Sequence, residues 1–205
     1  MEIQYNSPMK SLPRDIITTF IIAVIAFFAL HAAIESCVVI GPSMEPTVEE
    51  EQRLIINKLA YFFKNPERGD IVIFHPLNAQ QTDYIKRIIA IPGDTVEIKN
   101  GAVYVNGIRL NEPYIKDPPY YSFSPREVPA NNYFVLGDNR NNSNDSHNGW
   151  TIPRRNVIGK AWLRIWPLTS AGFLPGYPLD SQLAANPGDN IFKAIRQTGN
   201  TLERR

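Results

Sequence analysis

Two basic residues inside an apolar strand pattern are the first sign of chemistry in this sequence. The segment YIKRIIAIPGD, residues 84–94, carries Lys86 and Arg87 among aliphatic side chains. Because alternate side chains of a strand face opposite ways, both faces of this segment are largely apolar, and we expect burial on both sides. A buried arginine keeps its charge and needs a carboxylate, whereas a buried lysine can lose its proton. The alternative is an edge strand whose two cations reach solvent.

A dense polar run further along the chain is a candidate partner for these cations. The segment LGDNRNNSNDSHNGW, residues 136–150, lies between two predicted strands, 132–136 and 157–166. Most runs rich in Asn and Asp are solvated loops, which is the alternative here. Such a loop can also supply charge partners and hydrogen bonds to a buried site. The candidates are Asp138, Arg140, Ser143, Asp145 and His147.

Ser43 is the candidate nucleophile. It lies in VVIGPSMEPT, residues 38–47, with Pro42 directly before it and Pro46 three residues after it. Prolines restrict the backbone, and a rigid backbone suits a nucleophile that must be held in position. The alternatives are a structural serine in a turn and a helix start nearby, since TVEE beginning at Thr47 fits a capping box.

Motifs of other enzyme classes are missing. The segment GPSME lacks the last glycine of Gly-x-Ser-x-Gly, and no P-loop, dinucleotide-binding or His-Glu-x-x-His motif occurs. A Ser-His-Asp triad would need His75 or His147, and Asp145 near His147 keeps it open. The single cysteine, Cys37, fits neither a disulfide nor a zinc pattern. With 21 basic and 20 acidic residues, we expect no nucleic-acid partner, and we expect neither a metal nor another cofactor.

An apolar segment near the N-terminus would position this chemistry at a membrane. Residues 16–34 contain no formal charge and would span about 28 Å as a helix, close to the hydrocarbon core of a bilayer. Lys10 and Arg14 precede the segment, so the positive-inside rule places the N-terminus in the cytoplasm. A cleaved signal peptide is the alternative, but the segment is long and has no Ala-x-Ala site. We therefore predict a cytoplasmic N-terminus at 1–15 and a transmembrane anchor at 16–34.

The rest of the chain is typical of a mainly β protein. We predict an antiparallel β domain at 35–168, preceded by the one transmembrane helix and followed by a non-catalytic C-terminal tail at 169–205. Two Asn-Gly pairs within 95–110 predict tight hairpins. The predicted strands are 53–57, 69–74, 83–91, a meander at 95–110, 132–136 and 157–166. The predicted helical patches are 58–64 and 191–197, and the predicted loop is 111–131.

Four segments, in this order behind an N-terminal anchor, resemble the motifs of the type I signal peptidases, membrane-bound serine proteases with a Ser/Lys dyad. GPSMEPT at 41–47 is similar to the Ser-x-Met-x-Pro-Thr box, and RGDIVIF at 68–74 to the Arg-Gly-Asp-Ile-Val box. KRIIAIPGD at 86–94 is similar to the Lys-Arg box that ends in Pro-Gly-Asp. GDNRNNSNDSH at 137–147 is similar to the Gly-Asp-Asn-Arg box. The resemblance implies the β catalytic domain of that family, without its large inserted β domain.

The resemblance also implies catalytic roles. Ser43 would be the nucleophile and Lys86 its general base. Ser143 would hydrogen-bond and orient the lysine, and Asp145 would pair with Arg87. The residues that shape the site would be Asp138 and Arg140. Burial and the nearby Arg87 charge would lower the pKa of Lys86 from about 10.4 to ~7–8, provided that Asp145 binds the arginine rather than the lysine.

Substrate contacts follow from the same boxes. The oxyanion would bind backbone N–H groups including that of Ser43, because Gly41 stands where some members have a serine hydroxyl. The family box often ends in arginine, whereas this chain has His147. The implied substrate-binding residues are Val39, Gly41, Met44, Asp83 and Ile85.

The resemblance implies a signal peptidase I that cleaves signal peptides from exported preproteins after a small-x-small site. Its partners would be preproteins and the lipid bilayer. It would be a single-pass membrane protein with the catalytic domain on the outer, periplasmic or thylakoid-lumen side. Three alternatives stay open at this point: a protease with a histidine triad, an anchored β domain that only binds a partner, and an autoprotease of the repressor type.

Overall fold

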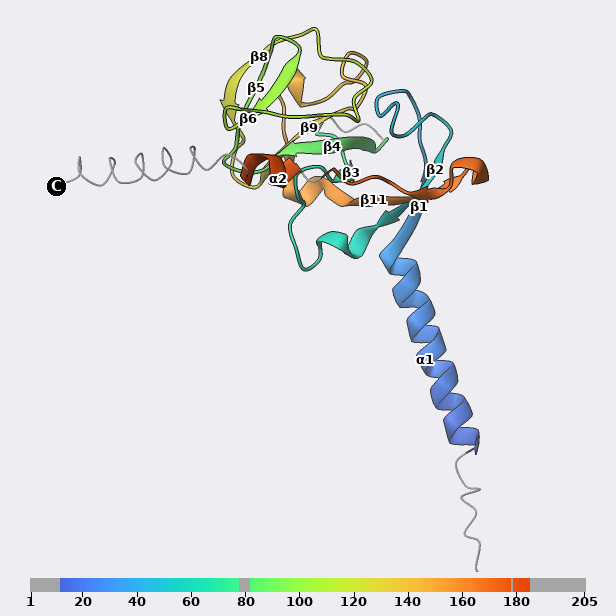
Figure 1. Cartoon of the computed structure of the whole chain (residues 1–205). Coiled ribbons are helices and arrows are strands. Elements are labelled where there is room, and N and C mark those ends of the chain that lie inside the picture. The colour runs from blue at the N-terminus through green and yellow to red at the C-terminus, as the bar shows by residue number, and fades with distance from the viewer. Residues whose placement is uncertain (1–11, 78–81, 178, 185–205) are drawn as a thin grey trace, which may run out of the picture.

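The computed structural model describes residues 12–77, 82–177 and 179–184. It has a mainly β body from which one long helix projects (Figure 1). The strand pairs formed by the described residues are all antiparallel, which confirms the mainly antiparallel β part of the predicted fold class. The predicted helix at 191–197 lies outside the described residues.

The elements agree closely with the predicted strands 53–57, 132–136 and 157–166. The strands are β1 (Ile34–Val38), β2 (Arg53–Asn57), β3 (Ile71–Phe74), β4 (Tyr84–Ala90), β5 (Thr95–Lys99), β6 (Ala102–Val105), β7 (Ile108–Arg109), β8 (Phe123–Glu127), β9 (Asn132–Leu136), β10 (Ile152–Pro153), β11 (Val157–Trp166) and β12 (Gly172–Phe173). The α-helices are α1 (Leu12–Ala33) and α2 (Leu179–Ala184), and the short 3₁₀ helices are η1 (Lys58–Tyr61), η2 (Ser146–Asn148), η3 (Arg154–Asn156) and η4 (Leu168–Ser170).

The larger sheet places the Lys86-Arg87 strand in its interior. Its strand order is β1-β2-β11-β3-β4-β9-β10, so β4 pairs with β3 on one side and β9 on the other. Every residue of β4 after Tyr84 is buried. The prediction of a strand buried on both faces is therefore confirmed, and the edge-strand alternative is wrong.

A smaller sheet, β7-β6-β5-β8, contains the predicted meander. Asn100-Gly101 joins β5 to β6, and Asn106-Gly107 joins β6 to β7. All four turn residues have positive φ, the conformation that tight hairpins between twisted strands need. The segment expected to be a loop at 111–131 contributes a strand, β8, because Phe123 at its start packs into the core shared with β5 and β6.

α1 forms where the apolar segment 16–34 was predicted to be helical, and it points away from the small sheet (Figure 1). Large apolar side chains along it are exposed, namely Ile16, Ile17, Phe20, Ile21, Ile22, Val24, Ile25, Phe27 and Phe28. Within the described residues, no helix combines the length and hydropathy needed to cross a membrane.

The body continues past the boundary predicted at residue 168. β12 pairs with β11, and Leu179 of α2 is completely buried in the core formed by β4, β5, β6 and β9. Composition hid this because the stretch is rich in Pro and Gly, and its few apolar anchors are spaced irregularly. The packed body therefore includes part of the predicted tail, with Leu179 and Leu183 of α2 in contact with the core.

Candidate active site

Ser43 lies in a tight turn that a second loop holds in place. The turn follows β1, and its ends are joined by hydrogen bonds from Val39 N–H to Gln52 C=O and from Glu51 N–H to Val39 C=O. Asn139 donates its backbone N–H to the Ser43 carbonyl oxygen (3.0 Å) and its side-chain amide to Pro42 C=O (3.1 Å). Asn139 lies in the polar run but was not predicted as a site residue. Its role is to bind backbone carbonyl groups, and the sequence does not distinguish such an asparagine from one in a solvated loop.

Thr47 does not start a helix, because residues 43–47 form turns and the next regular element is β2. Its hydroxyl donates to Asp138 Oδ2 (2.5 Å), and its carbonyl accepts from Arg164. The capping-box alternative is therefore wrong, and this end of the Ser43 turn is bound to the polar loop instead.

Lys86 points at Ser43. Its Nζ donates to Ser43 Oγ (2.8 Å) and to the Ile85 carbonyl oxygen (2.9 Å), and only 4% of the residue is exposed. Burial lowers the pKa of Lys86 to about 8, although the charges of Asp145 and Asp138 oppose that shift. A lysine with this pKa is partly neutral near pH 8 and can accept a proton from the serine hydroxyl.

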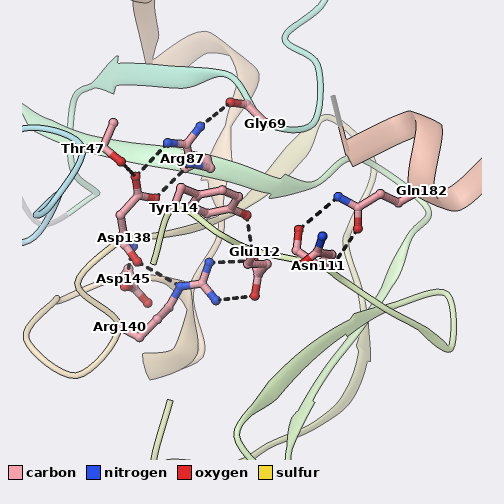
Figure 2. Close-up of polar contacts among 11 residues, drawn as sticks. Thr47, Gly69, Arg87, Asn111, Glu112, Tyr114, Asp138, Arg140, Asp145 and Gln182 are labelled. Atoms are coloured by element: carbon pink, nitrogen blue, oxygen red, sulfur yellow. Dashed lines mark hydrogen bonds and ion pairs between the residues drawn. The ribbon is translucent and has the colours of Figure 1, made fainter. Parts of the chain in front are cut away.

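Arg87 is paired with Asp138 and not, as predicted, with Asp145. Nε and Nη2 of Arg87 bind the two carboxylate oxygens of Asp138 at 2.9 and 2.7 Å, and Nη1 binds Gly69 C=O at 2.9 Å (Figure 2). Neither side chain of the pair is exposed. The charge of Arg87 is thus neutralised within the pair, and burial, not this charge, lowers the pKa of Lys86.

Asp145 binds backbone groups of the polar loop. It accepts hydrogen bonds from Gly137 N–H (2.9 Å) and from the backbone N–H of His147 (3.2 Å), and it is fully buried. Among the charges that act on Lys86 it raises the pKa most. The expected separation of this carboxylate from the lysine is therefore wrong.

Ser143 does not bind the lysine in this structure. Its Oγ is buried and has no hydrogen-bond partner among the described residues, which corrects the predicted Ser143–Lys86 bond. Ser143 packs instead against Gly137, where a Cβ would overlap both Ser143 Oγ and the Ser43 carbonyl oxygen. Position 137 therefore requires glycine, because Ser43 and Ser143 both lie against it. The sequence analysis did not identify this requirement.

Arg140 forms a second buried ion pair below the first. Its Nη1 and Nη2 bind Glu112 at 2.8 and 2.7 Å, and its Nε binds Gly137 C=O at 3.0 Å (Figure 2). Although burial opposes the charged form, Glu112 keeps the pKa of Arg140 above its ordinary value. Arg140 thus fixes the loop that carries Asp138. Its partner Glu112 was not predicted, because it lies in the segment 111–131 that was expected to be only a loop.

The histidines have other partners than the serine. His75 Nδ1 lies 2.6 Å from Asp83 at the exposed surface. His147 Nδ1 lies 2.7 Å from Asp145 Oδ1, and its ring stacks on Tyr121. Among the described residues, the side chain that hydrogen-bonds Ser43 Oγ is Lys86, so the geometry favours a Ser/Lys pair over a histidine triad.

A cavity of about 450 Å³ opens beside the pair. Of the residues that the resemblance implies for substrate binding, Val39, Asp83 and Ile85 line it, whereas Met44 and Gly41 do not. Met44 is fully buried in the core, and the Gly41 N–H donates to Glu50. The residues lining the cavity are Glu35, Cys37, Val38, Val39, Ile40, Ser43, Ile56, Ile73, Thr82, Asp83, Tyr84, Ile85, Lys86, Asn144 and Ile158. The lining thus combines seven aliphatic side chains with the serine and the lysine.

The Ser43 N–H has no acceptor among the described residues, so it is available to a bound group beside Oγ. The described residues also include no cluster of three or more His, Cys, Asp or Glu side chains that could hold a metal ion. A hydroxyl, a depressed-pKa amine and a free N–H beside an apolar cavity are the parts needed for acyl transfer to serine.

Comparison with known proteins agrees with this chemistry. The family model described as signal peptidase, peptidase S26, matches residues 13–166. Probable signal peptidase I-2 of Synechocystis sp. is 42% identical over 175 residues, covering 82% of this chain and 80% of the relative. Signal peptidase I of Leptolyngbya laminosa is 49% identical over 64% of this chain and 68% of the relative. Thylakoidal processing peptidase 1 of Arabidopsis thaliana is 36% identical over 79% of this chain and 51% of the relative.

Proposed function

Because the chain belongs to the signal peptidase family, peptidase S26, we propose that it removes signal peptides from exported preproteins as a serine endopeptidase, with Ser43 as nucleophile and Lys86 as general base. The observation that carries the two roles is the 2.8 Å contact between Lys86 Nζ and Ser43 Oγ, made by a lysine that is 4% exposed. Desolvation favours the neutral amine, which is the form a general base needs.

The reaction follows from this contact. Lys86 takes the Ser43 proton as Oγ attacks the scissile carbonyl, and the Ser43 N–H donates to the oxyanion that forms. The resulting ammonium gives its proton to the leaving amine, so that the mature protein departs and the signal peptide stays as an ester on Ser43. Neutral Lys86 then takes a proton from water as the water attacks the ester, and the resulting ammonium returns that proton to Ser43 Oγ as the signal peptide is released with a free carboxyl group.

The cavity supports the expected substrate class. Val39 and Ile85 give it aliphatic walls next to Ser43, which suits small apolar side chains near the scissile bond. Val38 and Ile40 lie at its rim and are exposed, and could contact an extended peptide. Asp83 lines the cavity while its carboxylate is bound to His75. We therefore propose Val39, Ile85 and Asp83 as substrate-contacting residues.

We also propose that α1 anchors the enzyme in a bilayer. The helix projects from the body with exposed apolar side chains, and its C-terminal end runs directly into β1, only a short turn before Ser43. η1 contacts α1, and Phe62 and Phe63 directly after η1 are highly exposed. Exposed phenylalanine side chains at a membrane surface can bury their rings at the boundary between headgroups and acyl chains. These features support a catalytic site held near the membrane surface.

The proposed topology has the N-terminus in the cytoplasm and the body on the outer side. Its support is the placement of Lys10 and Arg14 before the apolar segment. The relatives include both a signal peptidase I of Leptolyngbya laminosa and a chloroplastic thylakoidal processing peptidase of Arabidopsis thaliana, so a cell inner membrane and a thylakoid membrane both fit.

The test is cleavage of a preprotein with an Ala-x-Ala site by the full chain in detergent, with the product mass measured to locate the cut. We expect Ser43→Ala and Lys86→Ala to lower kcat/KM at least about 1000-fold. Lys99→Ala, a lysine in the small sheet, is the matched control and should retain the wild-type rate.

His147→Ala separates the two mechanisms. Retention of substantial activity supports the Ser/Lys pair, whereas loss in His147→Ala together with an active Lys86→Ala would replace it with the triad. If the folded wild type cleaves nothing, the remaining interpretation is an anchored β domain that only binds a partner.

A further inference from the structure

The segment after β11 contacts the buried arginine next to the lysine base. The family model ends at residue 166, but Tyr177 and α2 pack on the body beyond it. Leu179 is completely buried among the core residues of β4, β6 and β9, and Gln182 binds both the N–H and the C=O of Asn111 (2.7 and 3.1 Å; Figure 2). Arg68 bridges Asp94 of the body to Asp180 of α2. The segment is therefore bound to the body by three residues of α2.

Tyr177 is the part of this segment that reaches Arg87. The Arg87 guanidinium lies 4.2 Å from the ring centroid of Tyr114 and 5.2 Å from that of Tyr177, and the two rings are 4.6 Å apart. Both distances lie within the range of a cation–π contact. Tyr177 is partly exposed while Arg87 is completely buried, so the Tyr177 ring separates the guanidinium from water.

The backbone of Tyr177 makes a second contact with the support of Arg87. Gly69, whose carbonyl accepts from Arg87 Nη1, has positive φ, and a Cβ there would overlap the Tyr177 carbonyl oxygen. Gly69 also donates its N–H to Ile88 C=O on the same strand as the arginine. Tyr177 thus contacts the Arg87 side chain through its ring and contacts Gly69, which binds Arg87, through its backbone carbonyl.

Arg87 connects to the reacting groups through its carboxylate. Asp138 binds the guanidinium and accepts from Thr47 at the end of the Ser43 turn. The next residue, Asn139, binds the Ser43 carbonyl oxygen. Arg87 itself follows Lys86 on β4. If this ion pair moves or becomes hydrated, both β4, which carries Lys86, and the turn that carries Ser43 are therefore affected.

We propose that Tyr177 is a positioning residue of the active site: its ring keeps water from the Arg87–Asp138 pair, which in turn holds Lys86 and Ser43 in register. The inference deepens the proposed peptidase function and rests on it. The ring carries this role, because Tyr177 contacts Arg87 and Tyr114 through its aromatic ring.

The test uses the full chain in detergent with the Ala-x-Ala preprotein, and compares Tyr177→Ala, Tyr177→Leu and Tyr177→Phe. We expect Tyr177→Ala and Tyr177→Leu to lower kcat about tenfold with KM changed less than about twofold. The acid limb of their kcat/KM profile should move to higher pH, because water near the site weakens the desolvation that favours neutral Lys86. Tyr177→Phe should keep the wild-type kcat and the wild-type position of the acid limb. Tyr120→Ala, at a highly exposed tyrosine, is the matched control.

The outcomes are distinguishable from a failure of the proposed function. If the wild type cleaves and Tyr177→Leu stays folded with unchanged kcat and pH profile, the positioning role is wrong and Tyr177 only stabilises the fold. Failure of Tyr177→Phe to restore activity would also overturn it, because the ring would not be sufficient. If Tyr177→Ala does not fold, Tyr177→Leu decides. Absence of cleavage by the wild type would instead contradict the peptidase function itself.

Discussion

Arg87 and Asp138 form a two-point ion pair in which neither side chain is exposed to solvent. The pair joins β4, which carries the lysine, to the polar loop that holds the Ser43 turn. Removing one partner should destabilise the protein strongly, because the remaining buried charge would have neither water nor a counter-charge around it.

Asp138→Ala should therefore destabilise the body strongly. We expect a loss of about 3–5 kcal/mol in the free energy of unfolding, measured by denaturant titration in detergent. The double variant Arg87→Met with Asp138→Leu should recover most of this loss, since it removes both charges. A double variant no more stable than Asp138→Ala would contradict the account. Glu67→Ala, which removes the partner of the exposed Lys64, is the control and should change stability far less.

The pH dependence of cleavage should follow Lys86. Its pKa is lowered to about 8 by burial, and the reacting form is the neutral amine, so activity is present above that pH and lost below it. We expect kcat/KM to fall about tenfold for each pH unit on the acid side of about 8. The measurement is kcat/KM between about pH 6 and 10 on a substrate without titrating groups near its site. An acid limb centred near the pKa of histidine would argue for His147 instead.

Asp145→Asn should move that acid limb to lower pH. The Asp145 charge stabilises protonated Lys86 and so raises its pKa, and the amide removes the charge while keeping an oxygen for Gly137 N–H. We expect a shift of up to about one pH unit. Asp117→Asn, at the surface, should leave the limb in place. A shift to higher pH in Asp145→Asn would mean that the carboxylate does not act on Lys86 as the structure indicates.

Gly137→Ala should disable the site without unfolding the core. The new methyl group would overlap Ser143 Oγ and the Ser43 carbonyl oxygen, so the nucleophile turn must shift. A displacement of about 1 Å at reacting groups lowers rates about 100-fold, which is the loss in kcat we expect. Gly172→Ala is the matched control, because a Cβ at Gly172 meets nothing within 4 Å. Wild-type kcat in Gly137→Ala would show that the close approach is not required.

The elements were largely predictable because local patterns specify them. β9 and β11 have the predicted bounds, and the Asn-Gly turns at 100–101 and 106–107 form as expected. The apolar faces of the Lys86-Arg87 segment were enough to predict an interior strand, since a charge there had to be paired or neutralised. The motif resemblance added the pairing of Ser43 with Lys86, which the 2.8 Å contact supports.

What the sequence could not decide was which charges would meet. Asp138 and Asp145 belong to one polar run and either could reach Arg87, but loop geometry brings Asp138 to the arginine and leaves Asp145 near the lysine. Met44 follows the nucleophile directly, yet the turn directs it into the core and away from the cavity.

The sequence by itself determined the antiparallel fold and the type of chemistry, because periodicity, turn residues and the choice of serine, lysine and carboxylates are local properties. Only the tertiary structure decided the pairing of Arg87, the packing of Gly137 against two serines and the docking of Tyr177 on the site. Three of these contacts, Arg87–Asp138, Ser43–Gly137 and Arg87–Tyr177, join residues that are 51, 94 and 90 positions apart in the chain. Contacts at such separations depend on how whole strands and loops pack, which no local pattern encodes.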